Sequence, residues 1–327
     1  MTLSVAVVGA GLAGLACARR LADAGLRVTS FEKSRGLGGR LATRRADPGL
    51  RFDHGAQFVT ARGTAFRALL HKLEAAAALA AWTPRGRGPK ADTTWWVGTP
   101  GMAALVRPLA EGLDIRLTAR VVAVTETAEG WGLTLQDGQT AGPFDRLVLA
   151  LPQTQAGELL AGRPEVEALS AVRVAPCWTA MLAFAEPLQT DFDVRQSDEP
   201  LLSWAARNAS KPGRDAVPES WVLQAGPEWS AAHLEAEPEE ILPLLTAAFA
   251  SQAGALPEPL YATAHRWRYA RTIAPLGRPF LDCGGLLVGG DWCLGARAEA
   301  AYDSGLAMAD AILEQMGLEE TGLGEAG

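Results

Sequence analysis

A short glycine-rich turn, GAGLAG, lies between an apolar run at residues 3–8 and an Ala- and Leu-rich helical pattern at residues 12–24. A second apolar run follows at residues 26–31. A strand, a helix and a strand in such a short stretch predict a βαβ unit, and hence a parallel sheet that is buried on both faces. This unit restricts the chain to folds in which helices cover both faces of a sheet.

Gly9, Gly11 and Gly14 have the spacing of the GxGxxG turn of dinucleotide-binding proteins. The first glycine permits the tight turn, the second lets the backbone approach a pyrophosphate, and the third lets the helix pack against the strand. The helix N-terminus presents free N–H groups to the phosphates. Glu32, next to the second strand, is placed to accept hydrogen bonds from a ribose diol. Dinucleotide binding is therefore the leading interpretation, with packing alone as the alternative.

A second glycine cluster directly after Glu32 favours FAD over NAD. The segment EKSRGLGGR contains Gly36, Gly38 and Gly39. It also contains Arg35 and Arg40, and such a loop beside the pyrophosphate is expected where a long dinucleotide is held in extended form. The alternative interpretation is a solvated basic loop.

A third glycine-containing segment, GGDWCLG, joins the apolar run at residues 285–290 to a helical pattern at residues 299–316. Its Gly290 and Asp291 stand where a strand meets a helix, and Asp291 is suited to bind a ribityl hydroxyl. The positive end of the helix dipole stabilises negative charge on a flavin ring. Nucleotide-facing loops at both ends of the chain fit FAD better than NAD.

The whole pattern predicts an α/β protein with a Rossmann-type FAD-binding domain and an inserted substrate domain, which is a largely antiparallel β-sheet flanked by helices. The expected FAD-binding domain comprises residues 1–63, 95–160 and 270–316. The expected substrate domain comprises residues 64–94 and 161–269, and residues 317–327 are expected to form a flexible tail. Helices are expected at residues 64–81, 102–111 and 239–254.

Charge and composition exclude several classes of protein. The formal net charge is −7 and no basic run stands out, which argues against nucleic acid and anionic membrane surfaces as partners. No stretch is apolar enough to span a membrane. The four Cys form no CxxC pair and the four His are scattered, so we expect neither a disulfide framework nor a metal site. A cytoplasmic monomer or homodimer is the expectation.

Several longer segments resemble the renalase family of flavoproteins, in particular its bacterial branch. They run from the first strand to the last helix and leave only the tail uncovered, and ARNASKP and HRWRYAR are the more specific ones. The segments are GAGLAGLACARRL, FEKSRGLGGRLATRR, FDHGAQFVTAR, WVGTPGM, LVLALPQTQA, ARNASKP, HRWRYAR and GGDWCLGARAEAA.

This resemblance implies an amine-oxidase-type fold with non-covalently bound FAD. It further implies oxidation of isomeric dihydronicotinamide forms of NAD(P)H to NAD(P)+, with O2 reduced to hydrogen peroxide. Two alternatives stay open, a flavin amine oxidase and a flavin redox sensor without turnover. A sensor is expected to lack substrate-dependent bleaching of the flavin.

The resemblance also assigns residues to parts of FAD. The adenosine and pyrophosphate are assigned to Leu12, Ala13, Glu32, Lys33 and Arg40. The flavin ring is assigned to Ala56 and Gln57, adenine to the backbone of Val122, and the ribityl and pyrimidine side to Asp291, Arg297 and Ala298.

Hydride transfer from a dihydropyridine to flavin needs flat apolar walls and a few hydrogen bonds rather than an acid–base triad. The candidate pocket residues are Trp204, Asn208, His265, Trp267 and Trp292. Each has a structural alternative, because a buried Trp is more often part of a core, a lone His is often a hydrogen-bonded structural residue, and Asn208 stands in a turn-like segment with Lys211. Likewise, Arg266, Arg268 and Arg271 either meet phosphates or form a solvated strand face.

Overall fold

The computed structural model describes residues 2–86 and 93–317, and its chain divides into two compact units. The first takes its described residues from Met1–Leu37, Leu109–Val172 and Ala274–Gly327, and the second from Gly38–Pro108 and Arg173–Ile273. Of the expected tail, only Gly317 lies within the described residues.

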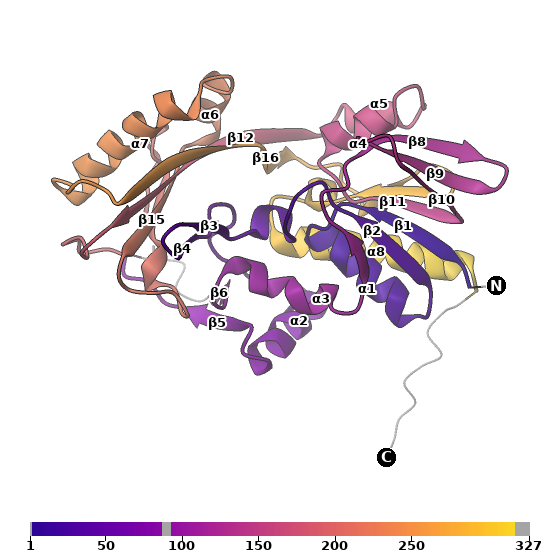
Figure 1. The fold of residues 1–327 in the computed structure, drawn as a ribbon, viewed down its shortest axis with the longest axis horizontal. Coiled ribbons are helices and arrows are strands. Elements are labelled where there is room, and N and C mark those ends of the chain that lie inside the picture. The colour runs from indigo at the N-terminus through magenta and orange to yellow at the C-terminus, as the bar shows by residue number, and fades with distance from the viewer. Residues whose placement is uncertain (1, 87–92, 318–327) are drawn as a thin grey trace, which may run out of the picture. The chain divides into compact units, whose positions relative to one another are not determined.

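The first unit is built on a six-stranded sheet that contains the predicted βαβ unit (Figure 1). Strands β18, β11, β1, β2 and β7 run parallel, and β17 is antiparallel to β18 at the edge. Because Val5, Ala6 and Val7 are fully buried, β1 has the apolar character expected of a central parallel strand. The strands in spatial order are β17 (Phe280–Asp282), β18 (Leu286–Gly289), β11 (Arg146–Leu149), β1 (Ser4–Val8), β2 (Arg27–Phe31) and β7 (Asp114–Arg116).

Two helices pack together against this sheet, α1 (Leu12–Asp23) and α8 (Ala298–Gln315). They approach so closely that a Cβ on Gly305 of α8 would lie 2.2 Å from the carbonyl oxygen of Ala13. The unit also contains α4 (Gln153–Leu159), α5 (Val166–Leu169) and a three-stranded antiparallel sheet of β10 (Thr140–Phe144), β9 (Gly130–Leu135) and β8 (Val121–Thr127).

The second unit is built on a five-stranded sheet, in agreement with the predicted antiparallel domain. Helix α7 (Pro238–Ala253) packs on it, and α6 (Pro227–Ala232) lies beside β12. The core between them contains Trp178, Trp221 and Phe249, all fully buried. The strands in order are β13 (Val194–Gln196), β14 (Trp204–Arg207), β15 (Glu219–Gln224), β12 (Arg173–Phe184) and β16 (Tyr261–Ala274).

Shorter elements complete the second unit. Two hairpins are formed by β3 (Arg44–Ala46) with β4 (Leu50–Phe52), and by β5 (Leu79–Trp82) with β6 (Trp95–Gly98). The others are α2 (Thr64–Ala75), α3 (Arg107–Ala110) and the 3₁₀ turns Gly39–Leu41, Met102–Leu105 and Asn208–Ser210.

Two helix predictions need correction. The helix expected at residues 64–81 ends at Ala75, because Leu79–Trp82 instead pairs with β6 through backbone hydrogen bonds. The helix expected at residues 102–111 is a 3₁₀ turn followed by the short α3, with Pro108 in the latter. Proline has no N–H to donate, which disfavours one continuous helix.

The compact units also divide the chain differently from the expected domains. Residues 38–63 and 95–108 belong to the second unit. The reason is a shared apolar cluster, in which Leu50 and Phe52 of β4 pack with Met181, Ala183 and Val222 of the large antiparallel sheet.

Candidate flavin site

The glycines of the first turn have separate structural tasks. Gly9 has φ +104°, and a Cβ there would lie 2.4 Å from the carbonyl oxygen of Ala150. A Cβ on Gly14 would lie 1.9 Å from the carbonyl oxygen of Gly9, so these two positions require glycine for packing. A Cβ on Gly11, in contrast, would meet nothing within 4 Å. The backbone at Gly11 therefore faces open space at the start of α1, where Leu12 and Ala13 begin the helix.

Glu32 lies directly after β2 and is buried beside this turn. One carboxylate oxygen accepts a hydrogen bond from the N–H of Ala10, and the other accepts one from the N–H of Ser34, each at 2.8 Å. These contacts fix the carboxylate at the end of the strand, where its remaining lone pairs can accept from hydroxyl groups. Contact of this carboxylate with a ribose stays a prediction from the sequence.

A cavity of about 530 Å³ opens next to Glu32 in the first unit. It is large enough for a nucleoside. Its lining residues are Lys33, Ser34, Thr118, Ala119, Arg120, Leu135, Gln136 and Asp137. Val122 is close by in β8 but does not line the cavity, and its side chain is exposed. Sequence reasoning missed Arg120 and Gln136, because only the pairing of β8 with β9 brings them to the cavity. Arg35 is exposed.

The GGDWCLG connection is tightly packed in the first unit. Gly290 has φ +154° and donates its N–H to the hydroxyl oxygen of Ser304 at 3.0 Å. Asp291 begins a 3₁₀ turn, and Arg297, which precedes Ala298 at the start of α8, forms an ion pair with Glu299 at 2.9 Å.

Trp292 of this connection is only 1% exposed, and its indole N–H donates to the carbonyl oxygen of Leu151 at 2.8 Å. This placement favours a role in the core over a role as a substrate wall.

In the second unit, two segments that sequence analysis assigned to FAD lie side by side. The N–H of Ala56 donates to the carbonyl oxygen of Arg40 at 2.9 Å. A Cβ on Gly55 would lie 2.1 Å from the same oxygen, so the close approach requires glycine. Arg40, which follows Gly39, also donates from its guanidinium to the carbonyl oxygen of Ala270 at 3.0 Å.

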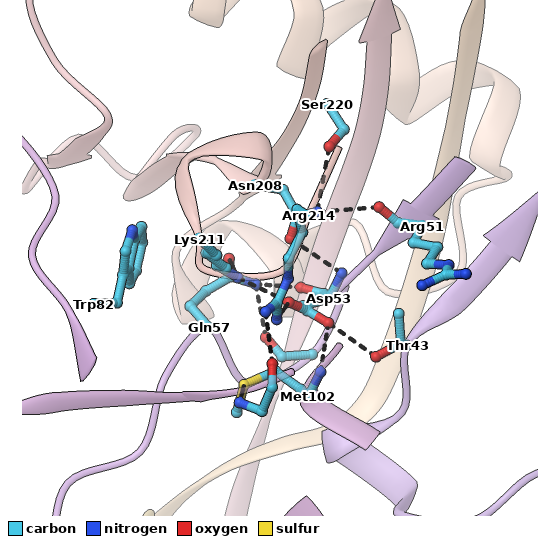
Figure 2. A network of polar contacts seen from close by, with 12 residues as sticks. Thr43, Arg51, Asp53, Gln57, Trp82, Met102, Asn208, Lys211, Arg214 and Ser220 are labelled. Carbon is cyan, nitrogen blue, oxygen red and sulfur yellow. Dashed lines mark hydrogen bonds and ion pairs between the residues drawn. The ribbon is translucent and has the colours of Figure 1, made fainter. Parts of the chain in front are cut away.

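A buried polar network holds the start of the loop that contains Ala56 (Figure 2). Its centre is Asp53, whose carboxylate accepts hydrogen bonds from the Thr43 hydroxyl at 2.9 Å and the Met102 N–H at 2.8 Å. It also accepts from the guanidinium of Arg214 at 2.5 Å and the Nζ of Lys211 at 3.3 Å. All three charged side chains are buried, with exposures of 1% for Asp53, 3% for Arg214 and 0% for Lys211.

Burial and charge act in opposite directions on the pKa values of this network. Burial by itself raises the pKa of Asp53, but the cations Lys211 and Arg214 and the Met102 N–H outweigh it and hold the pKa below its usual value. Burial lowers the pKa of Lys211 to about 8, against the opposing effect of Asp53.

Asn208 belongs to the same network rather than to an open pocket. Its amide donates to the carbonyl oxygen of Arg51 at 3.0 Å and to the Ser220 hydroxyl at 3.2 Å, and its Oδ1 accepts from the N–H of Asp53. It is only 1% exposed. These contacts support the structural alternative for Asn208, because its hydrogen-bonding groups are engaged within the protein.

Three aromatic rings meet next to this network. The ring centroids of His54 and His265 are 5.0 Å apart, and Trp267 lies 4.9 Å from His54 and 4.6 Å from His265. The indole N–H of Trp267 donates to the carbonyl oxygen of His54 at 2.9 Å. We call these three residues the His–Trp group.

Both histidines of the His–Trp group are held in the neutral form. Burial is the main cause, and the positive charge of Arg44 adds to it, so the pKa of each falls to about 4 from an ordinary 6.5. At His54, the neighbouring His265 also disfavours protonation. At neutral pH the group therefore offers uncharged hydrogen-bonding nitrogen atoms and aromatic surface.

Trp204 belongs to a separate aromatic cluster. It is tilted against Phe58 and Trp95, each with ring centroids 5.9 Å away, while these two rings stack at 3.9 Å. The indole N–H of Trp204 is buried and has no hydrogen-bond partner among the described residues.

Two of the arginines on β16 have protein partners. Arg268 forms a two-pronged ion pair with Glu235, with both N–O distances at 2.6 Å, and Arg266 donates to the carbonyl oxygen of Leu234 at 2.6 Å. These contacts favour a surface role over a phosphate site for Arg266 and Arg268.

Comparison with known proteins agrees with this geometry. A Rossmann turn that leaves space above Gly11, and a carboxylate fixed beside a nucleoside-sized cavity, are features of a dinucleotide-binding protein. Residues 7–73 match the NAD(P)-binding Rossmann-like domain model, and residues 73–313 match the model of the flavin-containing amine oxidoreductases. The chain belongs to the family of flavin-containing amine oxidoreductases, and FAD is its cofactor.

Two solved structures share the fold over nearly the whole chain. One is a proposed protoporphyrinogen oxidase from Exiguobacterium sp. 255-15, with TM-score 0.76 and 14% identity, covering 96% of this chain and 99% of that chain. Another is cyclohexylamine oxidase from Brevibacterium oxydans IH-35A, with TM-score 0.75 and 14% identity, covering 97% and 100%. At this identity the likeness establishes the fold alone.

A curated relative matches a short stretch only. The 4,4'-diapophytoene desaturase of Staphylococcus haemolyticus is 49% identical over 57 residues, which are 17% of this chain and 11% of that protein. The match thus spans about a tenth of the relative's length.

The sequence predicts neither a membrane span nor a metal site, and the structure bears on these predictions only in the residues that it describes. No helix within residues 2–86 and 93–317 combines the length and apolar character that a membrane span requires. Across the same residues, no three His, Cys, Asp or Glu side chains gather in a group able to hold a metal ion. All four cysteines are free thiols.

The two kinds of glycine predict opposite mutant phenotypes. Gly11→Ala places its methyl group in open space, so we expect an unchanged melting temperature of the apoprotein and about tenfold weaker FAD binding, because the methyl group obstructs the phosphates. Gly14→Ala forces a clash with Gly9, and we expect a loss of about 1–3 kcal/mol in unfolding free energy. Apoprotein melting and FAD titration separate the two effects. Equal phenotypes for the two variants would contradict this assignment.

Removal of the Asp53 charge is expected to destabilise the protein strongly. Asp53→Asn leaves two buried cations without their counter-charge, and we expect the free energy of unfolding to fall by about 3–5 kcal/mol in urea denaturation. Asp191→Asn is the control, because that side chain is 89% exposed. A loss no larger than that of the control would show that Asp53 has little structural importance.

The neutral histidines predict a specific sensitivity to acid. Between pH 6.5 and about 4 the folded His54 and His265 bind fewer protons than the unfolded chain, so stability falls as the pH falls through this window. His54→Phe and His265→Phe should each reduce the stability difference between pH 7 and pH 5 in urea unfolding. His71→Phe, at a position 62% exposed, should leave that difference unchanged. An unchanged difference in all three variants would refute the neutral assignment.

Proposed function

We propose that this chain is an FAD-dependent oxidase of isomeric dihydro-NAD(P). It takes a hydride from the 2- or 6-dihydronicotinamide form and releases NAD(P)+. The hydride and one proton then pass to O2, which gives H2O2. Bound FAD supplies the hydride acceptor at N5 and the reaction with O2.

The observation that carries the proposal is the His–Trp group. It combines a broad indole surface with two imidazoles that stay neutral at physiological pH. Loss of a hydride from a dihydropyridine gives a stable pyridinium, so the site needs no proton acceptor. Flat rings are suited to position the nicotinamide, and neutral imidazole nitrogen atoms are suited to bind its carboxamide.

The electrostatic environment also favours a dinucleotide over an amine. Arg44 is close enough to lower the pKa of both histidines. The same positive charge repels a protonated amine and attracts a pyrophosphate. Arg44 thus supports a substrate with negative charge.

The proposed holoenzyme uses the residues assigned from the sequence. In the first unit, FAD is bound by Gly9, Gly11, Leu12, Ala13, Gly14, Glu32, Lys33, Arg35, Val122, Gly290, Asp291, Arg297 and Ala298. For Gly39, Arg40, Ala56 and Gln57, contact with FAD stays a prediction from the sequence. Binding is non-covalent. Open space above Gly11 and the cavity beside Glu32 are the features of the structure that fit the pyrophosphate and adenosine. His54, His265, Trp204 and Trp267 face the substrate in this proposal.

Amine oxidation is the second candidate, because the matching family model is that of the flavin-containing amine oxidoreductases. The same experiment distinguishes the two. The purified yellow protein is mixed anaerobically with 2- or 6-dihydro-NAD, with ordinary NADH or with cyclohexylamine, and the flavin absorption is followed.

We expect rapid bleaching with a dihydro-NAD isomer, formation of NAD+, and release of H2O2 once air is admitted. Bleaching with the amine alone would overturn the proposal in favour of amine oxidation. No bleaching with any of them would also overturn it and favour a sensor.

A matched pair of variants tests the role of the His–Trp group. Trp267→Leu removes one wall, and we expect the rate constant of bleaching to fall about tenfold through poorer orientation of the substrate. Trp229→Leu is the control, because Trp229 stacks on His233 at 4.0 Å, outside this group. Equal rates in both variants and the unmodified enzyme would argue against the assigned site.

A further inference from the structure

Lys211 is a fully buried amine that the proposed reaction does not use. It lies just beyond the 3₁₀ turn Asn208–Ser210, and its Nζ is 5.3 Å from the ring centroid of Trp82. Burial of a lysine is costly, and it is retained only where partners satisfy the ammonium group. Its partners therefore indicate what the residue does.

One partner of Lys211 is the amide of Gln57. The Nζ donates to Gln57 Oε1 at 3.2 Å, and Gln57 Nε2 donates to the carbonyl oxygens of Asp53 at 2.5 Å and Gly55 at 3.1 Å. Because the oxygen of Gln57 is held by Lys211, its NH₂ group is directed at the loop backbone. Lys211 thus fixes the orientation of Gln57, and Gln57 in turn bridges two loop carbonyls.

A second partner of Lys211 is the carboxylate of Asp53, at the start of the same loop. The loop from Asp53 to Phe58 includes His54 of the His–Trp group, and Ala56 within it is tied to Arg40. One ammonium group therefore contacts the loop at two points, at its beginning and near its end (Figure 2).

We propose that Lys211 is a positioning residue, which holds Gln57 and thereby keeps the loop Asp53–Phe58 in the conformation that the reaction requires. This inference rests on the proposed function only in giving that loop a role in the reaction. The hydrogen-bond chain from Lys211 through Gln57 to the backbone stands independently of the substrate.

The charge of Lys211 gives the inference a pH dependence. The groups that face its Nζ are Asp53, Arg214, Gln57 and the ring of Trp82. Burial lowers the pKa of Lys211 to about 8, so the amine becomes neutral above that pH and its ion pair with Asp53 is lost. The pair of Asp53 with Arg214 persists, because a guanidinium does not lose its proton in this range. The loop is then held less firmly.

Hydrogen exchange of the FAD-loaded protein without substrate tests the inference directly. In Lys211→Met we expect the protection factors of peptides covering Asp53–Phe58 to fall about tenfold, while those of α7 stay unchanged. Lys72→Met is the matched control and should leave both unchanged. In the unmodified protein the protection of the loop should fall above pH 8, and in Lys211→Met it should not.

Unchanged loop protection in a folded Lys211→Met protein would overturn the inference. If Lys211→Met loses hydrogen-exchange protection throughout the protein, Gln57→Leu is the deciding variant, because it keeps the ion pair between Lys211 and Asp53. In Gln57→Leu, a loss of protection confined to the loop Asp53–Phe58 supports the inference, and full retention of protection in that loop overturns it.

A double-mutant cycle on the flavin bleaching rate adds a functional measurement. If Lys211 acts through Gln57, Lys211→Met should slow bleaching about tenfold alone but less than about twofold in the Gln57→Leu background. Equal effects in both backgrounds would contradict this route. Because exchange is measured without substrate, failure of the proposed function leaves the positioning result intact.

Discussion

The buried carboxylate of Asp53 is the interaction on which the second unit depends. It joins Thr43, Met102, Lys211 and Arg214, which come from three separate stretches of sequence. A buried anion with so many donors is stable only if each donor is in place, so the network fixes all three stretches at once. The network also restrains the loop that begins at Asp53, and this fixes the positions of His54 and Gln57.

The first unit is densely packed, and yet it leaves space for a ligand. Gly9 and Gly14 pack so closely against neighbouring backbone that any side chain would clash, whereas Gly11 faces open space. Glu32 is held by two backbone N–H groups before any ligand arrives. Backbone contacts thus shape the turn at Gly11 and fix the carboxylate of Glu32 beside it.

Local sequence signals predicted the features that depend on neighbouring residues. The glycine spacing, the position of Glu32 and the apolar strands could all be identified because turn geometry and burial act over a few residues. The antiparallel sheet of the second unit was predicted on the same basis. The helix expected through residue 81 was wrong, because pairing of Leu79–Trp82 with β6 depends on a distant strand.

Long-range contacts explain what the sequence did not reveal. Lys211 and Arg214 are more than 150 positions from Asp53, so no spacing rule links them. Asn208 and Trp292 were assigned to the substrate, but the carbonyl oxygens that they bond are set by the tertiary fold. Arg120 and Gln136 reach the cavity only through the pairing of two strands. In these cases the residue type indicated a possible chemical role, and the tertiary contacts determined how the side chain is used.

A crystal structure of the holoenzyme with NAD+ would show where the flavin and nicotinamide rings bind. We expect the flavin ring to contact Ala56 and Gln57, and the nicotinamide ring to lie between the flavin and the His–Trp group. A nicotinamide bound away from His54, His265 and Trp267, or a flavin ring without contact to the loop Asp53–Phe58, would contradict this expectation.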